Sequence, residues 1–134
     1  MKELKLTLPT SIMVGKKRFY FSLNNYRNAH YQTLNKAKVN YAKTVYIRVL
    51  EAGKQEFDSA EISFLYHPAT KRKWDLDNID AVTRKFVIDA LVSCGVLKDD
   101  DTGYIRMLTA VVGEQWETAS VEVVVSNMPI LNNG

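Results

Sequence analysis

The chain has 134 residues, the length of one ordinary domain, and its 46% hydrophobic and 25% charged content is typical of a globular protein with a buried core. Its one cysteine, Cys94, excludes an internal disulfide and favours a reducing, cytoplasmic setting, and no apolar run is long enough to cross a membrane. Charge is divided unevenly: residues 1–73 hold 14 Lys and Arg against 5 Asp and Glu, whereas residues 74–134 hold 4 against 10. A basic half of this kind suits a polyanionic partner, but on basicity alone the favoured explanation is that Lys and Arg solvate helix faces.

Strands and one long helix are predicted in the first half of the chain. Residues 2–8 alternate polar and apolar side chains, as a half-buried strand does. Residues 16–18 are typical of a turn before a short strand over 19–21, and residues 24–28 of a polar loop. Apolar residues recur at helical spacing over 35–52, where Gly53 is a natural end. Residues 60–67 alternate again and predict a further strand.

The second half is predicted to hold one helix and two strands. Residues 78–94 show helical spacing, with Asp77 or Asn78 as the N-cap and Gly95 after the end, and residues 96–97 return to the core. Strands are expected over 104–112 and 119–125, with 113–118 joining them as a hairpin, and 126–134 is expected to be a flexible tail. The order predicts a single α+β domain over residues 1–134, with a small mixed β-sheet packed with two main helices.

The aspartates are concentrated in one stretch, because seven of the chain's eight lie between Trp74 and Asp101. In extended backbone, Asp75 and Asp77 point the same way and can hold one cation. Hard oxygen ligands of this kind suit Mg²⁺, with Mn²⁺ as a possible substitute, and a carboxylate from residues 99–101 completes the site if the helix returns the chain to it. Simple helix capping and a solvated turn explain some of these residues, but neither explains Asp75 or the basic run before it.

The segment 71–102 resembles the RusA family of Holliday-junction resolvases, which phages and prophages often encode. The resemblance is carried by a basic run, the motif Asp75-Leu76-Asp77-Asn78, then Asp89-Ala90-Leu91, Gly95-Val96 and Asp99-Asp100. It implies a RusA-like fold, metal binding by Asp75, Asp77 and Asp100, with assistance from Asp99 or Asp101, and a catalytic lysine at Lys85. Counted from the first motif, that lysine falls at Ala81, so the chain carries four extra residues, about one helical turn.

The resemblance implies a Mg²⁺-dependent, structure-specific DNA endonuclease that resolves four-way junctions by paired symmetric nicks, as a homodimer, in recombination or repair. The candidate DNA contacts are the following basic residues: Lys16, Lys17, Arg18, Arg27, Lys36, Lys43, Lys71, Arg72 and Lys73. Two alternatives stay open. One is a nuclease of the same fold that acts on flaps, forks or replication intermediates, and the other is a non-catalytic branched-DNA-binding accessory protein. His67 is expected to be a surface or structural residue, and Trp74 a core residue rather than a base-stacking one.

Overall fold

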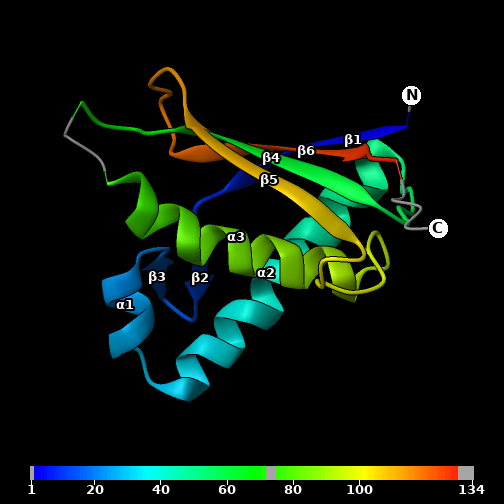
Figure 1. Cartoon of the computed structure of the whole chain (residues 1–134). Helices are drawn as coiled ribbons and strands as arrows, with labels where there is room; N and C mark the ends of the chain where they lie inside the picture. Colours follow the sequence, from blue (N-terminus) through cyan, green and yellow to red (C-terminus); the bar gives the residue numbers. More distant parts are fainter. Residues whose placement is uncertain (1, 72–74, 130–134) are drawn as a thin grey trace.

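A four-stranded sheet lies over two long helices in the computed structural model, which describes residues 2–71 and 75–129 (Figure 1). In chain order the elements are β1 (Glu3–Pro9), β2 (Ser11–Val14), β3 (Lys17–Tyr20), α1 (Leu23–Asn28), α2 (Tyr31–Ala52), β4 (Ala60–His67), α3 (Leu76–Ser93), β5 (Ile105–Val112) and β6 (Ser120–Asn127). The predicted α+β class, with a small mixed sheet and two main helices, is confirmed. None of the described helices is long and apolar enough to span a membrane.

The sheet has the strand order β1-β6-β4-β5, in which β4 and β5 are parallel and the other neighbours antiparallel. The predicted hairpin between the last two strands is wrong, because β4 lies between β5 and β6. The connecting loop is instead bound to the end of β4: the Gly113 N–H donates to the Tyr66 carbonyl at 2.8 Å, and the Trp116 N–H to the Pro68 carbonyl at 3.0 Å. The helix α3 connects the two parallel strands, as such a pair requires.

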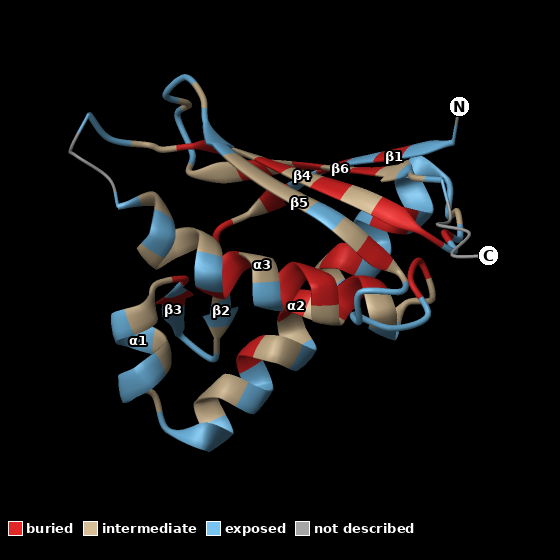
Figure 2. Cartoon of the chain, viewed as in Figure 1, coloured by how far each residue is buried: buried red, intermediate tan, exposed pale blue. Residues whose placement is uncertain are grey.

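The core fills the space between the sheet and the helices (Figure 2). Every second residue of β1, β4 and β6 is buried, which leaves one apolar face on each strand. Helix α2 contributes Tyr41, and α3 contributes Phe86, to an aromatic cluster with Phe21, whose ring centroid lies 4.4 Å from that of Phe86 and 4.9 Å from that of Tyr41. Burying a side chain of this size stabilises the fold by about 1.5–3 kcal/mol.

Two segments of the first half differ from the sequence-based expectation. The predicted polar loop over 24–28 is wrong, because residues 23–28 form α1, in which the Ser22 side chain caps the helix by accepting from the Asn25 N–H. The turn predicted over 16–18 is displaced by one residue. It spans Gly15 and Lys16 in the β2–β3 hairpin, with Gly15 at a φ of 61°, and Lys17 and Arg18 belong to β3.

The end of α3 follows the prediction, whereas the predicted tail does not. Gly95 has a φ of 82° just after the helix, as the C′ position favours, and Val96 and Leu97 are buried. Ser126 and Asn127 belong to β6 and pair with Glu61 and Ala60 of β4, so the expected flexible tail is wrong at these positions. Residues 130–134 lie outside the described part of the chain.

Candidate metal and nucleic-acid site

The first acidic motif lies at the start of α3. The Asp75 carboxylate caps the helix, with its Oδ1 3.4 Å from the Asn78 backbone nitrogen, and the helix begins at Leu76. The prediction of a cap at Asp77 or Asn78, with extended backbone before it, is therefore wrong. The N-terminal N–H groups of a helix need an acceptor, and Asp75 is the first residue in position to supply one. Asp77 lies in the first turn, and both carboxylates are exposed.

Asn78 joins this helix to the first one. Its Oδ1 accepts a hydrogen bond from the Leu23 backbone N–H at 2.9 Å, at the start of α1. The second half of the motif therefore has a tertiary structural role, and the carboxylates beside it remain available to solvent.

The second acidic run lies in the loop after α3, and its three members differ. Asp99 Oδ1 accepts from the Asp100 N–H at 2.8 Å, and Asp101 Oδ1 accepts from the Gly103 N–H at 2.8 Å, so both carboxylates stabilise the turn. Within the described residues, the Asp100 carboxylate makes no such bond and faces a groove instead. Asp100 is thus the member of the run that lines the groove and whose two carboxylate oxygens are both free of turn hydrogen bonds.

A groove of about 400 Å³ separates α3 from β5 and from the loop between them. Its lining consists of Ala81, Arg84, Lys85, Ile88 and Asp89 from α3, Asp100 and Thr102 from the loop, and Ile105 and Leu108 from β5. The structure therefore brings together two predicted site residues, Lys85 and Asp100. Lys85 and Asp89 stand four residues apart and both line the groove, but they form no ion pair among the described residues.

One copy of the chain does not bring all three predicted metal ligands together. Asp75 and Asp77 lie at the start of α3, whereas Asp100 lies in the loop after the helix and lines the groove beside Lys85 and Asp89. Among the described residues, no three His, Cys, Asp or Glu side chains form a group that could hold a metal ion. The donor chemistry fits a hard divalent cation, since the exposed oxygens of Asp77 and Asp100 and the second oxygen of Asp75 are not used in capping.

Arg84 is a groove residue that the sequence analysis missed. The Tyr66 hydroxyl donates to Asp80 Oδ1 at 2.5 Å, and Asp80 Oδ2 lies 2.7 Å from Arg84 Nη2, so that a buried strand holds the guanidinium in place. The guanidinium carbon of Arg84 also lies 5.6 Å from the centroid of the Phe64 ring. Burial and the Asp80 carboxylate raise the pKa of Tyr66, which therefore stays a hydrogen-bond donor. The i,i+4 spacing of Asp80 and Arg84 was a readable signal of this pair.

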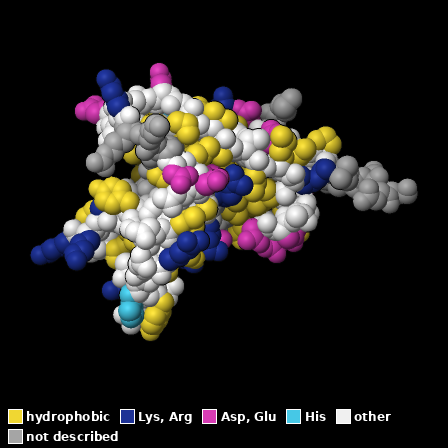
Figure 3. Space-filling view, turned by 60° about the vertical axis from the view of Figure 1, so that its left-hand side comes forward, with side chains coloured by type: hydrophobic (Ala, Val, Ile, Leu, Met, Phe, Trp, Pro, Cys, Tyr) yellow, Lys and Arg dark blue, Asp and Glu magenta, His cyan; other side chains and the backbone are white. Residues whose placement is uncertain are grey.

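The described candidate DNA contacts are all exposed but lie on several elements. The β2–β3 hairpin carries Lys16, Lys17 and Arg18, the last turn of α1 carries Arg27, α2 carries Lys36 and Lys43, and Lys71 follows β4. Arg72, Lys73 and Trp74 lie outside the described residues. Figure 3 shows acidic side chains with Lys and Arg beside them on the face that carries the start of α3. This combination of carboxylates and cations suits a phosphate backbone with a metal ion.

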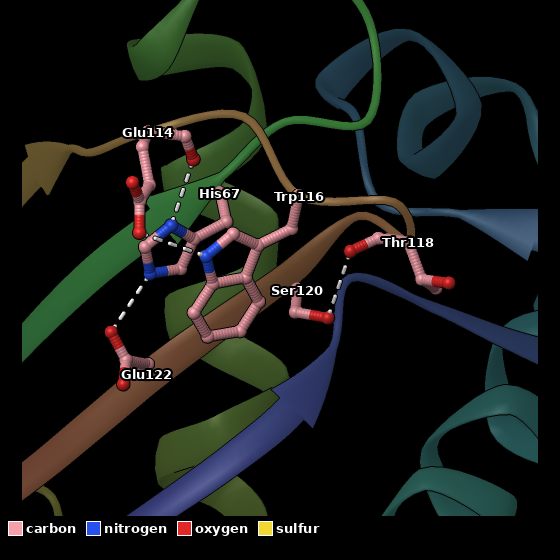
Figure 4. Close-up of polar contacts among 6 residues, drawn as sticks. All are labelled: His67, Glu114, Trp116, Thr118, Ser120 and Glu122. Carbon is pink, nitrogen blue, oxygen red and sulfur yellow. Dashed lines mark hydrogen bonds and ion pairs between the residues drawn. The ribbon is translucent and has the colours of Figure 1, made fainter.

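His67 is buried at the end of β4 (Figure 4). Of the two roles predicted for it, surface or structural, the contacts of its ring support the structural one. Its ring nitrogens face the Glu114 carbonyl and the Glu122 carboxylate. The loop that closes over it exposes Glu114 and Glu117 to solvent.

The chain matches no model of a known protein family, and no curated protein shows significant similarity to it. The assignment of a function to this fold therefore depends on the residues of the site.

Proposed function

We propose that the protein is a Mg²⁺-dependent, structure-specific DNA endonuclease of the RusA type, which resolves Holliday junctions in the cytoplasm of a bacterial or phage-infected cell. The observation that carries this proposal is the groove between α3 and β5, where Lys85 and the available carboxylate of Asp100 lie against the same space. An acid and a cation that converge from distant parts of a chain are typical of a phosphoryl-transfer site.

In this proposal, Asp75, Asp77 and Asp100 hold Mg²⁺, or Mn²⁺ in its place. The bound cation supplies charge stabilisation to the phosphate and lowers the cost of forming the attacking nucleophile. Lys85 neutralises the negative charge that develops on the phosphate, and its position in the groove beside Asp100 supports this role. Asp99 and Asp101 assist by keeping the Asp100 loop in its turn.

The proposed substrate is a four-way junction, and the proposed active form is a homodimer. A four-way junction is two-fold symmetric, and two symmetric nicks require two related sites, which a C₂ dimer supplies. The exposed lysines and arginines contact phosphates and set the position of the junction arms, so binding falls as salt rises.

One observation favours a second candidate, a DNA-binding accessory protein without catalytic activity. The described residues of a single copy contain no group of three ligands that could hold a metal. Such a protein binds branched DNA through the same basic residues but leaves every strand intact.

The test is incubation of the pure protein with a synthetic four-way junction, with Mg²⁺ or with EDTA, beside a linear duplex and a flap. Paired symmetric nicks in the junction alone, and only with Mg²⁺, are the expected result on a denaturing gel. Preferential cutting of the flap would move the assignment to a flap or fork nuclease. Tight binding with no nick at any Mg²⁺ concentration would support the accessory protein instead.

A further inference from the structure

Helix α2 is apolar on two opposite sides. Its inner side packs into the core through four buried residues, Ala37, Tyr41, Val45 and Val49. The side of such a helix that faces away from the core is ordinarily polar. Here the outer side carries four large apolar residues that are about half exposed: Val39 at 54%, Tyr46 at 45%, Ile47 at 54% and Leu50 at 51%. A contiguous apolar surface of this kind marks an interaction site.

The four exposed residues form one stripe along α2, which we call the α2 stripe. Tyr46 follows Val39 by two helical turns and Leu50 follows Tyr46 by about one more, so the three side chains lie on the same side of the helix. Ile47 lies beside them. From Val39 to Leu50 the stripe is about 16 Å long at 1.5 Å per residue, which is the length of three turns of a second helix.

A groove of about 410 Å³, the α2 groove, borders this stripe. It is lined by residues of α2 and by the end of α3, namely Val39, Ala42, Lys43, Tyr46, Ser93 and Cys94. Its volume lies at the small end of the range of binding pockets, and it admits a large apolar side chain of a partner.

The charges around the α2 stripe are positive. Lys43 lines the groove and Lys36 is exposed two turns before it, and neither forms an ion pair within the described part of the chain. Lys54 extends over Gly95, with its Nζ 3.1 Å from the position that a Cβ atom would take there. The one carboxylate of α2, Glu51, already lies 3.4 Å from an Arg48 nitrogen. The surface therefore favours a partner with Asp or Glu at its rim.

These features distinguish three kinds of occupant. A DNA backbone suits Lys36 and Lys43 but not the apolar stripe, because phosphates are contacted by charged and polar groups. A second copy of this chain would cover the stripe, but it would bring a second set of these lysines against the first, which is unfavourable. An acidic partner with an apolar face matches both the stripe and the charges.

We propose that the outer side of α2 binds a helical segment of another protein, apolar on one side and with Asp or Glu along its edges. The apolar side packs on the α2 stripe and places one large side chain in the α2 groove, while the carboxylates pair with Lys36, Lys43 and Lys54. Of the candidate DNA contacts, the proposal reassigns Lys36 and Lys43 to this partner. It does not depend on the proposed nuclease function.

Peptide display tests the surface without a known partner. Random peptides of about 16 residues, long enough as a helix to cover the stripe, are displayed on phage and selected on the immobilised wild-type protein. The selected peptides are expected to carry apolar residues at i, i+3 or i+4, and i+7, and a net negative charge. Selection of no peptide, or of basic peptides without this spacing, would overturn the proposal.

Variants of α2 test where the selected peptides bind. Ile47→Gln/Leu50→Gln is expected to weaken binding by about tenfold in fluorescence anisotropy, because glutamine keeps the helix but removes the apolar contact. Lys36→Gln/Lys43→Gln is expected to weaken it by about tenfold at low salt and by less at high salt.

Tyr31→Gln is the matched control, since Tyr31 is 66% exposed on the same helix but lies outside the stripe and the groove. It is expected to bind the selected peptides as the wild type does, and circular dichroism checks that every variant is folded. Wild-type affinity in both double variants would overturn the proposal.

The same double variants decide between a protein partner, DNA and a second copy. Lys36→Gln/Lys43→Gln is expected to bind a four-way junction within about twofold of the wild type, and a larger loss would assign the surface to DNA and overturn the proposal. Ile47→Gln/Leu50→Gln is expected to keep the wild-type oligomeric state by light scattering, and a change would place a second copy on the stripe instead. If the wild type binds no junction, the proposed nuclease function fails, while peptide binding still decides this proposal.

Discussion

The imidazole of His67 lies flat against the indole of Trp116, with the ring centroids 3.6 Å apart and the planes within 4° of each other (Figure 4). His67 Nδ1 lies 2.8 Å from the Glu114 carbonyl oxygen, and Nε2 lies 2.8 Å from Glu122 Oε2. A carbonyl oxygen and a carboxylate oxygen therefore face the two ring nitrogens, each within hydrogen-bond distance. The stack fixes the loop between β5 and β6 on the end of β4, directly before the segment that leads to Asp75.

Removal of this buried ring is expected to destabilise the domain. His67→Ala removes a buried ring, its contacts with Glu114 and Glu122, and the stacking partner of Trp116, which together lower the free energy of unfolding by about 2–4 kcal/mol in a urea titration. Glu117→Ala, at an exposed position of the same loop, is the control and is expected to change stability by less than about 0.5 kcal/mol. Equal stability of the two variants would contradict the structural role of His67.

Asp75 caps α3 and is a proposed metal ligand, and substitution can separate these two roles. Asp75→Ala removes the helix cap and is expected to lower the free energy of unfolding by about 1 kcal/mol, whereas Asp75→Asn keeps a capping oxygen and most of that stability. Both variants lose the proposed metal ligand, so both are expected to abolish cleavage and to leave junction binding largely intact, as measured on native gels. Cleavage near the wild-type rate by Asp75→Asn would contradict the role of the carboxylate as a ligand.

The same reasoning separates the three aspartates of the second run. Asp100→Asn is expected to abolish cleavage, because its carboxylate is the one that faces the groove. Asp99→Asn and Asp101→Asn keep an oxygen that can accept the turn hydrogen bonds, so their single-turnover rates are expected to stay within about tenfold of wild type. Loss of activity in Asp101→Asn alone would show that Asp101, and not Asp100, is the ligand.

Local patterns predicted most elements, whereas long-range contacts determined those that the prediction missed. The strand over 60–67 was predicted with its observed bounds because its buried residues alternate, and Gly95 marked the end of α3 because only glycine accepts that φ readily. The six-residue α1 was missed because it depends on a hydrogen bond from Leu23 to Asn78, 55 positions away. The candidate carboxylates could be chosen by residue type, but the positions of Asp75 and Asp77 at the start of α3, and of Asp100 beside the groove, depend on the folded helix and the loop after it.

Arg84 is expected to contribute to the reaction, because Asp80 and the buried Tyr66 hold its guanidinium beside Lys85 and Asp100. Arg84→Ala is expected to lower the single-turnover cleavage rate by about 10²–10³-fold, the usual cost of losing one positioned donor to a developing charge. Arg48→Ala is the matched control, since Arg48 is also ion-paired on a helix, with Glu51, but lies outside the groove. Equal rates in the two variants would show that Arg84 has only a structural role.

Cys94 is expected to be a slow nucleophile. Burial raises the pKa of its thiol, and its Sγ lies 3.6 Å from the Leu91 carbonyl oxygen. A raised pKa leaves less thiolate at any pH below it, so the native protein is expected to react with a chromogenic disulfide at pH 8 more slowly than the same chain in urea. Rates that coincide in the two conditions would contradict the partial burial of the thiol.

The β2–β3 hairpin is expected to contact DNA phosphates, because Lys16 in its turn and Lys17 at the start of β3 are both exposed. Each lysine that neutralises a phosphate adds about 0.9 to the dependence of log K on log salt concentration, so Lys16→Ala/Lys17→Ala is expected to reduce that slope by about 2. The affinity should fall alike for junctions of different sequence, since phosphate contacts do not read bases. Lys5→Ala, on the edge strand β1, is the control and is expected to leave the slope unchanged. A wild-type slope in Lys16→Ala/Lys17→Ala would show that the hairpin does not contact the DNA.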